Sequence, residues 1–323
     1  MKGLKYFLLV NILTLLTQNT SAMDMLDEQD LSETVAKDGI SLSLAFPNST
    51  ISYDEIRISD HGGINGSTTH NSIGSIVIAP TTLSSSNGVR LLKADGSVST
   101  APIVVWADAD SNIATNKPVA NINLALPSDA KRIQISPFSV YLAPQLPLVA
   151  GKDTIFTDRT TNATRTGVRQ LLSIGGTGIN VNIKDNLVIN VQMGNTPQGH
   201  MFKLIGSISC ITSTQNCNLT DTIPVSVHDA SGSKITFGFA LKATDTNTGI
   251  RLNNVYGDVR STGLILGADG DLDKFDANLT NITLGTTGST NASHFEGLKN
   301  GAIGTIGLEG VKVSDLKMTI KGL

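Results

Sequence analysis

The sequence predicts an all-β protein whose strands form mainly antiparallel, sandwich-like sheets behind an extended N-terminal segment. Apolar and small polar residues alternate with a period of two in many short segments, as expected for strands with one buried face. Clusters of Gly, Asn, Asp and Ser separate these segments and are typical of tight turns. Charged residues make up only 16% of the chain, too few for a typical helical protein rich in Glu and Lys. An elongated curved sheet or a solenoid-like sheet is the alternative, because Gly residues interrupt the C-terminal strands, where they could mark bulges.

Residues 1–22 have the pattern of a secretory signal peptide. Lys2 and Lys5 precede an apolar run from Tyr6 to Leu16, and the small residues before position 23 suit cleavage after Ala22. An uncleaved membrane anchor is the alternative, but the apolar run is shorter than the roughly 20 residues that span a bilayer. The chain is therefore expected to be exported, with no membrane span left after cleavage.

Residues 23–48 combine an acidic segment with a strand. The acidic part has apolar residues at helix-compatible spacing, and a period of two begins after Gly39. That strand either pairs within its own sheet or is donated to the edge of a neighbouring subunit. The apolar positions of this candidate intersubunit strand are Ile40, Leu42, Leu44 and Phe46.

Residues 49–323 form a β-rich region. The Pro-rich and polar stretch near residues 144–168 is either a boundary between two parts or a long crossover between sheets. Alternation over Ile179–Ile183 and again over Leu187–Met193, around Asp185-Asn186, predicts a hairpin. Further strands are expected at 72–79, 101–106, 119–126, 132–142, 201–209, 222–227, 235–241, 264–266, 279–284, 304–308, 311–313 and 316–320.

The two cysteines, Cys210 and Cys217, are expected to form a disulfide. An exported chain enters an oxidising compartment, and no redox or metal-binding spacing surrounds this pair. The bridge would close a small loop and contribute about 2–3 kcal/mol in the chain-entropy model.

No group of residues has the spacing of a catalytic site, so the chain is expected not to be an enzyme. A nucleophile elbow, a zinc-binding His motif and a phosphate-binding Gly loop are all missing from the sequence. The net charge of −3 gives no reason to expect nucleic acid as a partner. No cofactor is predicted.

One acidic cluster could direct several oxygens at Ca²⁺, although it lacks the Gly and the closing Glu of an EF-hand. A solvated turn between strands is the alternative, and it is the favoured one. The cluster comprises Asp269, Asp271, Asp273 and Asp276.

Three stretches together resemble a known family. They are the mature N-terminus MDMLDEQDLSETVAKDGISLSL, the segment LVINVQMGNTPQGHMFKL, and the C-terminal GTIGLEGVKVSDLKMTIKG. They are similar to the FilA-like pilus-assembly proteins of Acinetobacter and related Gammaproteobacteria, although Ala36-Lys37 stands where that family has Gly-Gln. The matching residues are Leu31, Ser32, Asp38, Gly39, Ile40, Gly194, Asn195, Pro197, Gln198, Gly199, His200 and Met201.

The resemblance implies a structural or assembly component of a pilus-like appendage in the periplasm or on the outer surface of a Gram-negative bacterium. Its partners would be other pilus or envelope proteins, or further copies of itself. A secreted adhesin or ligand-binding β-module of the envelope is the alternative. The resemblance implies no catalytic residues.

Overall fold

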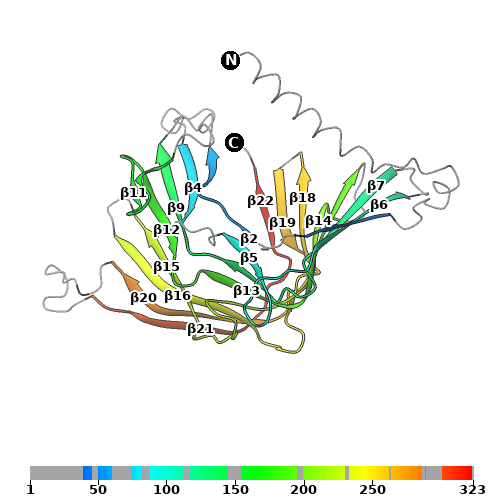
Figure 1. Ribbon diagram of the computed structural model, residues 1–323. Helices are drawn as coiled ribbons and strands as arrows, with labels where there is room; N and C mark the ends of the chain where they lie inside the picture. Colours follow the sequence, from blue (N-terminus) through cyan, green and yellow to red (C-terminus); the bar gives the residue numbers. More distant parts are fainter. Residues whose placement is uncertain are drawn as a thin grey trace, which may run out of the picture. The chain divides into compact units, whose positions relative to one another are not determined.

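The computed structural model describes residues 39–45, 50–59, 74–81, 88–112, 117–144, 154–194, 199–229, 233–261, 263–285, 288 and 300–321. Among these residues, twenty strands belong to one hydrogen-bonded sheet and two form a small second sheet (Figure 1). The expected all-β, antiparallel class is confirmed. The strands are β1 Ile40–Leu44, β2 Thr50–Ile51, β3 Ile56–Ser59, β4 Gly74–Pro80, β5 Val89–Leu92, β6 Ile103–Asn112, β7 Lys117–Ala125, β8 Arg132–Ile135, β9 Phe138–Pro144, β10 Phe156–Asp158, β11 Ala163–Thr164, β12 Arg169–Ile174, β13 Ile179–Gly194, β14 Phe202–Thr212, β15 Ile223–His228, β16 Lys234–Ala243, β17 Ile250–Arg251, β18 Val255–Arg260, β19 Gly263–Ala268, β20 Phe275–Leu284, β21 Gly304–Val311 and β22 Lys317–Ile320.

Two long series of antiparallel pairings organise the large sheet. One series runs β3–β4–β9–β12–β15–β16–β20–β21. The other runs β22–β19–β18–β14–β13–β7–β6. Strand β13 also pairs with β8, and β14 also pairs with β16. The β14–β16 pairing links the two series, whereas β8 belongs to neither of them.

A buried cluster covers one face of β4 and β9. Val77 and Ala79 of β4 meet Tyr141 of β9, and the segment before and after the β10–β11 hairpin packs on them through Ile155 and Val168. Phe156 completes the cluster with an edge-to-face contact to the Tyr141 ring at 5.5 Å between centroids. Ile155, Phe156 and Val168, which lie within the stretch 144–168, thus belong to the hydrophobic core. Ser41–Leu323 forms one compact unit.

The predicted hairpin over residues 179–193 is wrong. Residues Ile179–Gly194 form one continuous strand, β13, which pairs with β14 along its length. The register shifts between Asn182 and Val188, so the Asp185-Asn186 pair lies in a bulge rather than a turn. The Ser207 hydroxyl donates a hydrogen bond to Asp185 Oδ2 at 2.6 Å, which holds the bulge against β14.

A second correction concerns residues 132–142, which form two strands instead of one. β8 ends at Ile135 and β9 begins at Phe138. Pro137 lies between them and has no N–H to donate to a ladder. β8 then pairs with β5 and β13, whereas β9 pairs with β4 and β12. The break thus sends the chain to a different part of the sheet.

Several sequence predictions fall outside the described residues. They are the signal peptide at residues 1–22, the acidic segment up to Asp38, and Phe46 of the N-terminal strand. Within the described part of the chain there is no helix of the length and hydropathy needed to cross a membrane.

Candidate interaction surface

Seven neighbouring strands place their apolar residues on one face of the sheet. Residues directly opposite each other on paired strands project to the same side. Leu266 lies opposite Met318 on β22 and opposite Gly257 on β18. Gly257 in turn lies opposite Phe202 on β14, which lies opposite Val191 on β13. The register thus connects apolar positions strand by strand.

The same register continues through β7 to β6. Val191 lies opposite Ile122, which lies opposite Ala107. We call the resulting surface the seven-strand apolar face, and it carries no charged residue at its register positions on the described strands. Its members are Val105, Ala107, Ala109, Ala120, Ile122, Leu124, Ile189, Val191, Met193, Phe202, Leu204, Val255, Gly257, Val259, Leu264, Leu266, Ala268, Met318 and Ile320.

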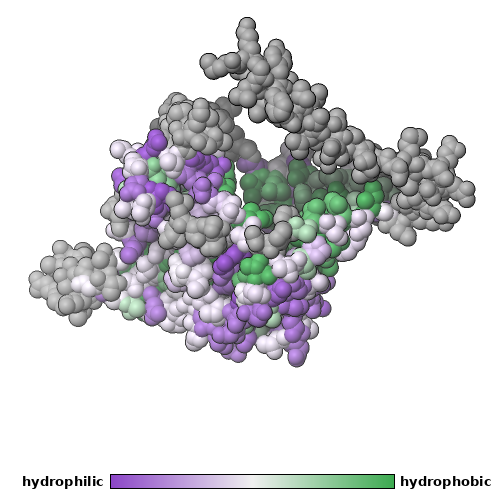
Figure 2. Space-filling view, viewed as in Figure 1, coloured by the Kyte–Doolittle hydropathy of each residue, from purple (hydrophilic) through white to green (hydrophobic). Residues whose placement is uncertain are grey.

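Much of this face is exposed to solvent. Val259 is 57% exposed, Met318 49% and Met193 48%. Figure 2 shows hydrophobic residues gathered over a hollowed surface where Figure 1 places β22, β19, β18, β14 and β7. Six strand spacings of about 4.8 Å make the face about 29 Å wide. A continuous apolar surface of this kind on a soluble protein usually marks an interaction site.

The opposite side of the same strands is mainly polar, with a few apolar residues such as Trp106 and Ile265. Asn190 of β13 donates a hydrogen bond from Nδ2 to Asn123 Oδ1 of β7 at 2.9 Å. Lys203 and Tyr256 lie opposite each other between β14 and β18. The period-two pattern therefore gives these strands one mainly polar face and one apolar face.

The N-terminal strand β1 lies next to β6. It covers Ile40–Leu44 and pairs with β6 of the same chain. All five of its residues are exposed, with Ile40 at 69% and Leu42 at 53%. Edge strands are normally protected by Lys, Pro or a bulge. β1 has no charged residue and no Pro, so its chemistry suits pairing with a further strand.

Strand β22 lies at the other end of the seven-strand series. It pairs with β19, and no register joins its other edge to any strand in the described part of the chain. Every one of its residues, Lys317–Ile320, is exposed. The seven strands of the apolar face therefore end in the exposed strand β22 on one side, and the exposed strand β1 follows them on the other.

A polar cluster around His200 lies on β18 and its neighbours. His200 Nδ1 is 3.0 Å from Asp258 Oδ2, and its Nε2 is 2.8 Å from Asp269 Oδ2. The imidazole stacks on the Tyr256 ring with 3.7 Å between centroids. Asp258 also accepts hydrogen bonds from the Met201 N–H and from Arg260. In the sequence, His200 stands out only within the motif that carries the resemblance, and nothing there links it to Asp258, which is 58 residues distant.

The four aspartates of the candidate Ca²⁺ cluster are engaged by separate partners. Asp269 contacts His200, and Asp273 accepts two hydrogen bonds from the Arg251 guanidinium. Asp271 pairs with Lys312 and Ser314, and Asp276 accepts from Thr244 and the Gly310 N–H. Within the described residues, no group of three or more His, Cys, Asp or Glu side chains is arranged to hold a metal ion.

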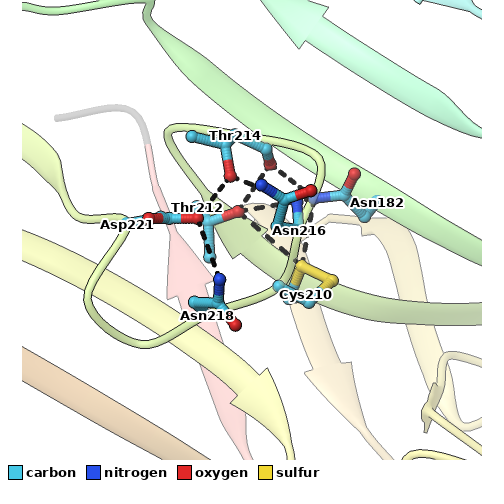
Figure 3. The surroundings of a disulfide bond; sticks show 8 residues. Asn182, Cys210, Thr212, Thr214, Asn216, Asn218 and Asp221 are labelled. Carbon is cyan, nitrogen blue, oxygen red and sulfur yellow. Dashed lines mark hydrogen bonds between the residues drawn. A yellow bond between two sulfur atoms is a disulfide. The ribbon is translucent and has the colours of Figure 1, made fainter. Parts of the chain in front are cut away.

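The expected disulfide is present. Cys210 on β14 is bonded to Cys217, with 5.5 Å between the Cα atoms. Figure 3 shows the loop that the bridge closes folded over Asn182 of β13, whose Nδ2 reaches Cys210 Sγ at 3.0 Å and the Thr214 carbonyl at 3.1 Å. Thr214 in turn donates from its hydroxyl to Asp221 at 2.6 Å. The disulfide and these hydrogen bonds attach the loop to the β13–β14 pair.

Comparisons with known proteins identify no relative of this chain. No family model, no curated protein and no solved structure matches this chain. The resemblance drawn from short sequence motifs therefore stands on those motifs alone. Of the Gly194–Met201 motif, residues 195–198 lie outside the described part, and Gly199 has the positive φ of 111° that its place in a turn requires.

Proposed function

We propose that this protein is a non-enzymatic structural or assembly component of a bacterial surface appendage, exported to the periplasm or the outer surface. The observation that carries the proposal is the seven-strand apolar face with an exposed strand at each end. An apolar face of this extent is stabilised when another surface covers it, at roughly 25 cal/mol per Å² of apolar area removed from water.

The partner that fits this face is a second copy of the chain. β1 and β22 are both exposed, and they flank opposite ends of the same face. Pairing of β22 in one copy with β1 in the next would continue the backbone ladder, and the apolar area removed from water would be that of side chains at the shared edge, such as Met318 and Ile320. Because the two strands differ, such a contact is heterologous, and repeating it produces an open polymer rather than a closed dimer.

The experiment that tests this proposal changes β1 without shortening the chain. Ile40, Leu42 and Leu44 are replaced together by Ser in the producing bacterium, and shed surface material is studied by electron microscopy and mass spectrometry. Because all three side chains are exposed, the β-core should stay folded while fibres containing the protein disappear. Deletion of residues 38–46 should have the same effect.

The matched control replaces Ser41 and Ser43 by Thr, which is also polar and favours strands. These residues lie between the three apolar positions, so this variant keeps the strand and its apolar pattern and should assemble like the wild-type protein. Normal fibres from the triple Ser variant would contradict the proposal. A folded wild-type protein that is absent from every fibre would favour the secreted adhesin or ligand-binding module instead.

A further inference from the structure

A second apolar surface lies on the eight strands of the other series, which are β3, β4, β9, β12, β15, β16, β20 and β21. Ile58 lies opposite Ile76, which lies opposite Leu142. The same register continues across β12 and β15, where Leu172 lies opposite Val227, and then to Ile235 of β16. We call this surface the eight-strand apolar face. Its further members include Ile56, Ile78, Val140, Ile174, Val225, Phe237, Phe239, Leu279, Leu284, Ile306 and Leu308.

The reverse side of β4 and β9 is already covered. Val77, Ala79 and Tyr141 alternate with the members of the eight-strand apolar face and are buried under Ile155 and its neighbours. Ile58 is 61% exposed, whereas Val77 is completely buried. Among the described residues, Ile155, Phe156 and Val168 thus cover one side of these strands and the other side is open.

One positively charged side chain lies at a register position on the open side of the sheet. Arg169, the first residue of β12, lies opposite Leu142. Among the described strands, it is the single charged residue at a register position of the eight-strand apolar face. No hydrogen-bond or ion-pair partner for its guanidinium occurs among the described residues.

Arg169 also lines a pocket at this end of the face. The pocket has a volume of about 520 Å³, and Ile58, Ile76 and Leu142 supply its aliphatic wall. Gly74 and Gly167 lie on the same lining and contribute backbone without side chains. A volume of this size lies within the roughly 300–1,000 Å³ of small-molecule sites, which combine apolar walls with a few polar groups that fix orientation.

We propose that this pocket binds a long-chain carboxylate, with the alkyl chain against Ile58, Ile76 and Leu142 and the carboxylate on Arg169. A guanidinium binds a carboxylate through two parallel hydrogen bonds, and such charge-assisted bonds are stronger than neutral ones. The other polar side chains among the described residues of the lining are Ser59 and Ser75, whose hydroxyls are hydrogen-bonded to each other at 3.0 Å. This inference goes beyond the proposed assembly function, because it requires only one copy of the chain.

Isothermal titration of the mature protein with 12-carbon ligands tests the proposal. Laurate should bind at one site, and more tightly than dodecanol, which lacks the charge. Dodecyl phosphate is the comparison ligand that distinguishes a carboxylate site from a site for any alkyl anion, because a guanidinium also binds phosphate.

The variant Arg169→Gln should weaken laurate binding several-fold, the loss expected for an ion pair at an exposed guanidinium, and leave dodecanol binding unchanged. Lys234→Gln is the control, because Lys234 precedes Ile235 on β16 and therefore projects to the other side of the sheet. It should bind laurate like the wild-type protein.

Equal affinities of the wild-type protein for laurate and dodecanol would overturn the proposal, as would an unchanged Arg169→Gln variant. Tighter binding of dodecyl phosphate would overturn the assignment of a carboxylate. Because Arg169 is exposed, the thermal unfolding of the variant should match that of the wild-type protein. The assembly experiment on β1 can fail without affecting any of these results.

Discussion

Asp258 on β18 is a buried carboxylate held by three donors, and its side chain is only 6% exposed. Burial by itself raises the pKa of Asp258. Hydrogen bonds from the Met201 N–H, from His200 and from Arg260 outweigh burial and hold that pKa below its ordinary value. Because the pKa is lower in the folded state, the carboxylate stabilises the fold above the unfolded pKa of about 3.9. That contribution is lost as the pH falls through the folded pKa.

Replacing Asp258 by Asn should therefore lower the free energy of unfolding at pH 7 by about 1.5–3 kcal/mol, the range for hydrogen bonds to a charged group. Urea denaturation at pH 7 and below pH 4 measures the difference between the two proteins. The difference should be full at pH 7 and should shrink in acid. Asp269→Asn is the control, since Asp269 also contacts His200 but is 65% exposed, so its loss should cost less than about 1 kcal/mol. Equal losses from the two variants at pH 7 would refute this account.

The disulfide gives a second prediction at the level of single residues. Replacing Cys210 and Cys217 together by Ala should lower the free energy of unfolding by about 2–3 kcal/mol, because the open loop has more conformations in the unfolded chain. Thermal unfolding with and without a reductant measures the effect. The wild-type protein should lose stability on reduction, and the double variant should not respond. A wild-type unfolding temperature that is insensitive to reduction would contradict the prediction.

At the level of strands, the period of two locates most elements because it depends only on local sequence. β14, β15, β16 and β20 lie where alternation predicts them, with ends displaced by a few residues. The period-two pattern does not predict β18, because Gly257 and Asp258 interrupt its apolar residues. Asp258 can lie in this strand because His200, from a distant part of the chain, forms a hydrogen bond with its carboxylate. The same pattern predicts two strands in place of β13, because Asp185-Asn186 is typical of a turn. In the structure the pair lies in a bulge opposite β14.

Gly206 faces that bulge and has a φ of 118°. A Cβ at this position would collide with the Asn186 carbonyl, and the backbone conformation itself disfavours an L side chain. Gly206→Ala should therefore lower the free energy of unfolding by about 1–3 kcal/mol or more. Gly270→Ala is the control, because Gly270 also has a positive φ but an added Cβ there would meet no atom within 4 Å. Chemical denaturation should show the larger loss for Gly206, and a larger loss for Gly270 would contradict the bulge geometry.

For the whole molecule, strand order could not be predicted from the sequence. β13 pairs with β7, β8 and β14, and these partners are set by contacts between residues far apart in the chain. Alternation does indicate which residues share a face, as for Ile189, Val191 and Met193. By itself it suggests that such a face is buried, since the apolar side of a strand usually packs on a core. The exposed seven-strand apolar face arises from the assembled register and is invisible in any single strand.

The candidate site was therefore predictable only in part. Alternation identifies Ile40, Leu42 and Leu44 as a strand with a potential partner outside the chain, and the structure places them in an exposed strand beside β6. The sequence alone does not indicate a ligand-binding role for Arg169. That role depends on Leu142 and Ile76, which lie on other strands of the sheet. Long-range pairing thus supplies what local sequence lacks.

The most direct test of self-association through the seven-strand apolar face is sedimentation velocity of the mature protein and two neighbouring variants of β22. Met318 lies on the face, and Thr319 projects to the other side of the same strand. The wild-type protein and Thr319→Asp should associate increasingly with concentration, whereas Met318→Asp should stay monomeric with unchanged thermal unfolding. A wild-type protein that is monomeric at every concentration, or a Met318→Asp variant that associates like the wild-type protein, would contradict the account.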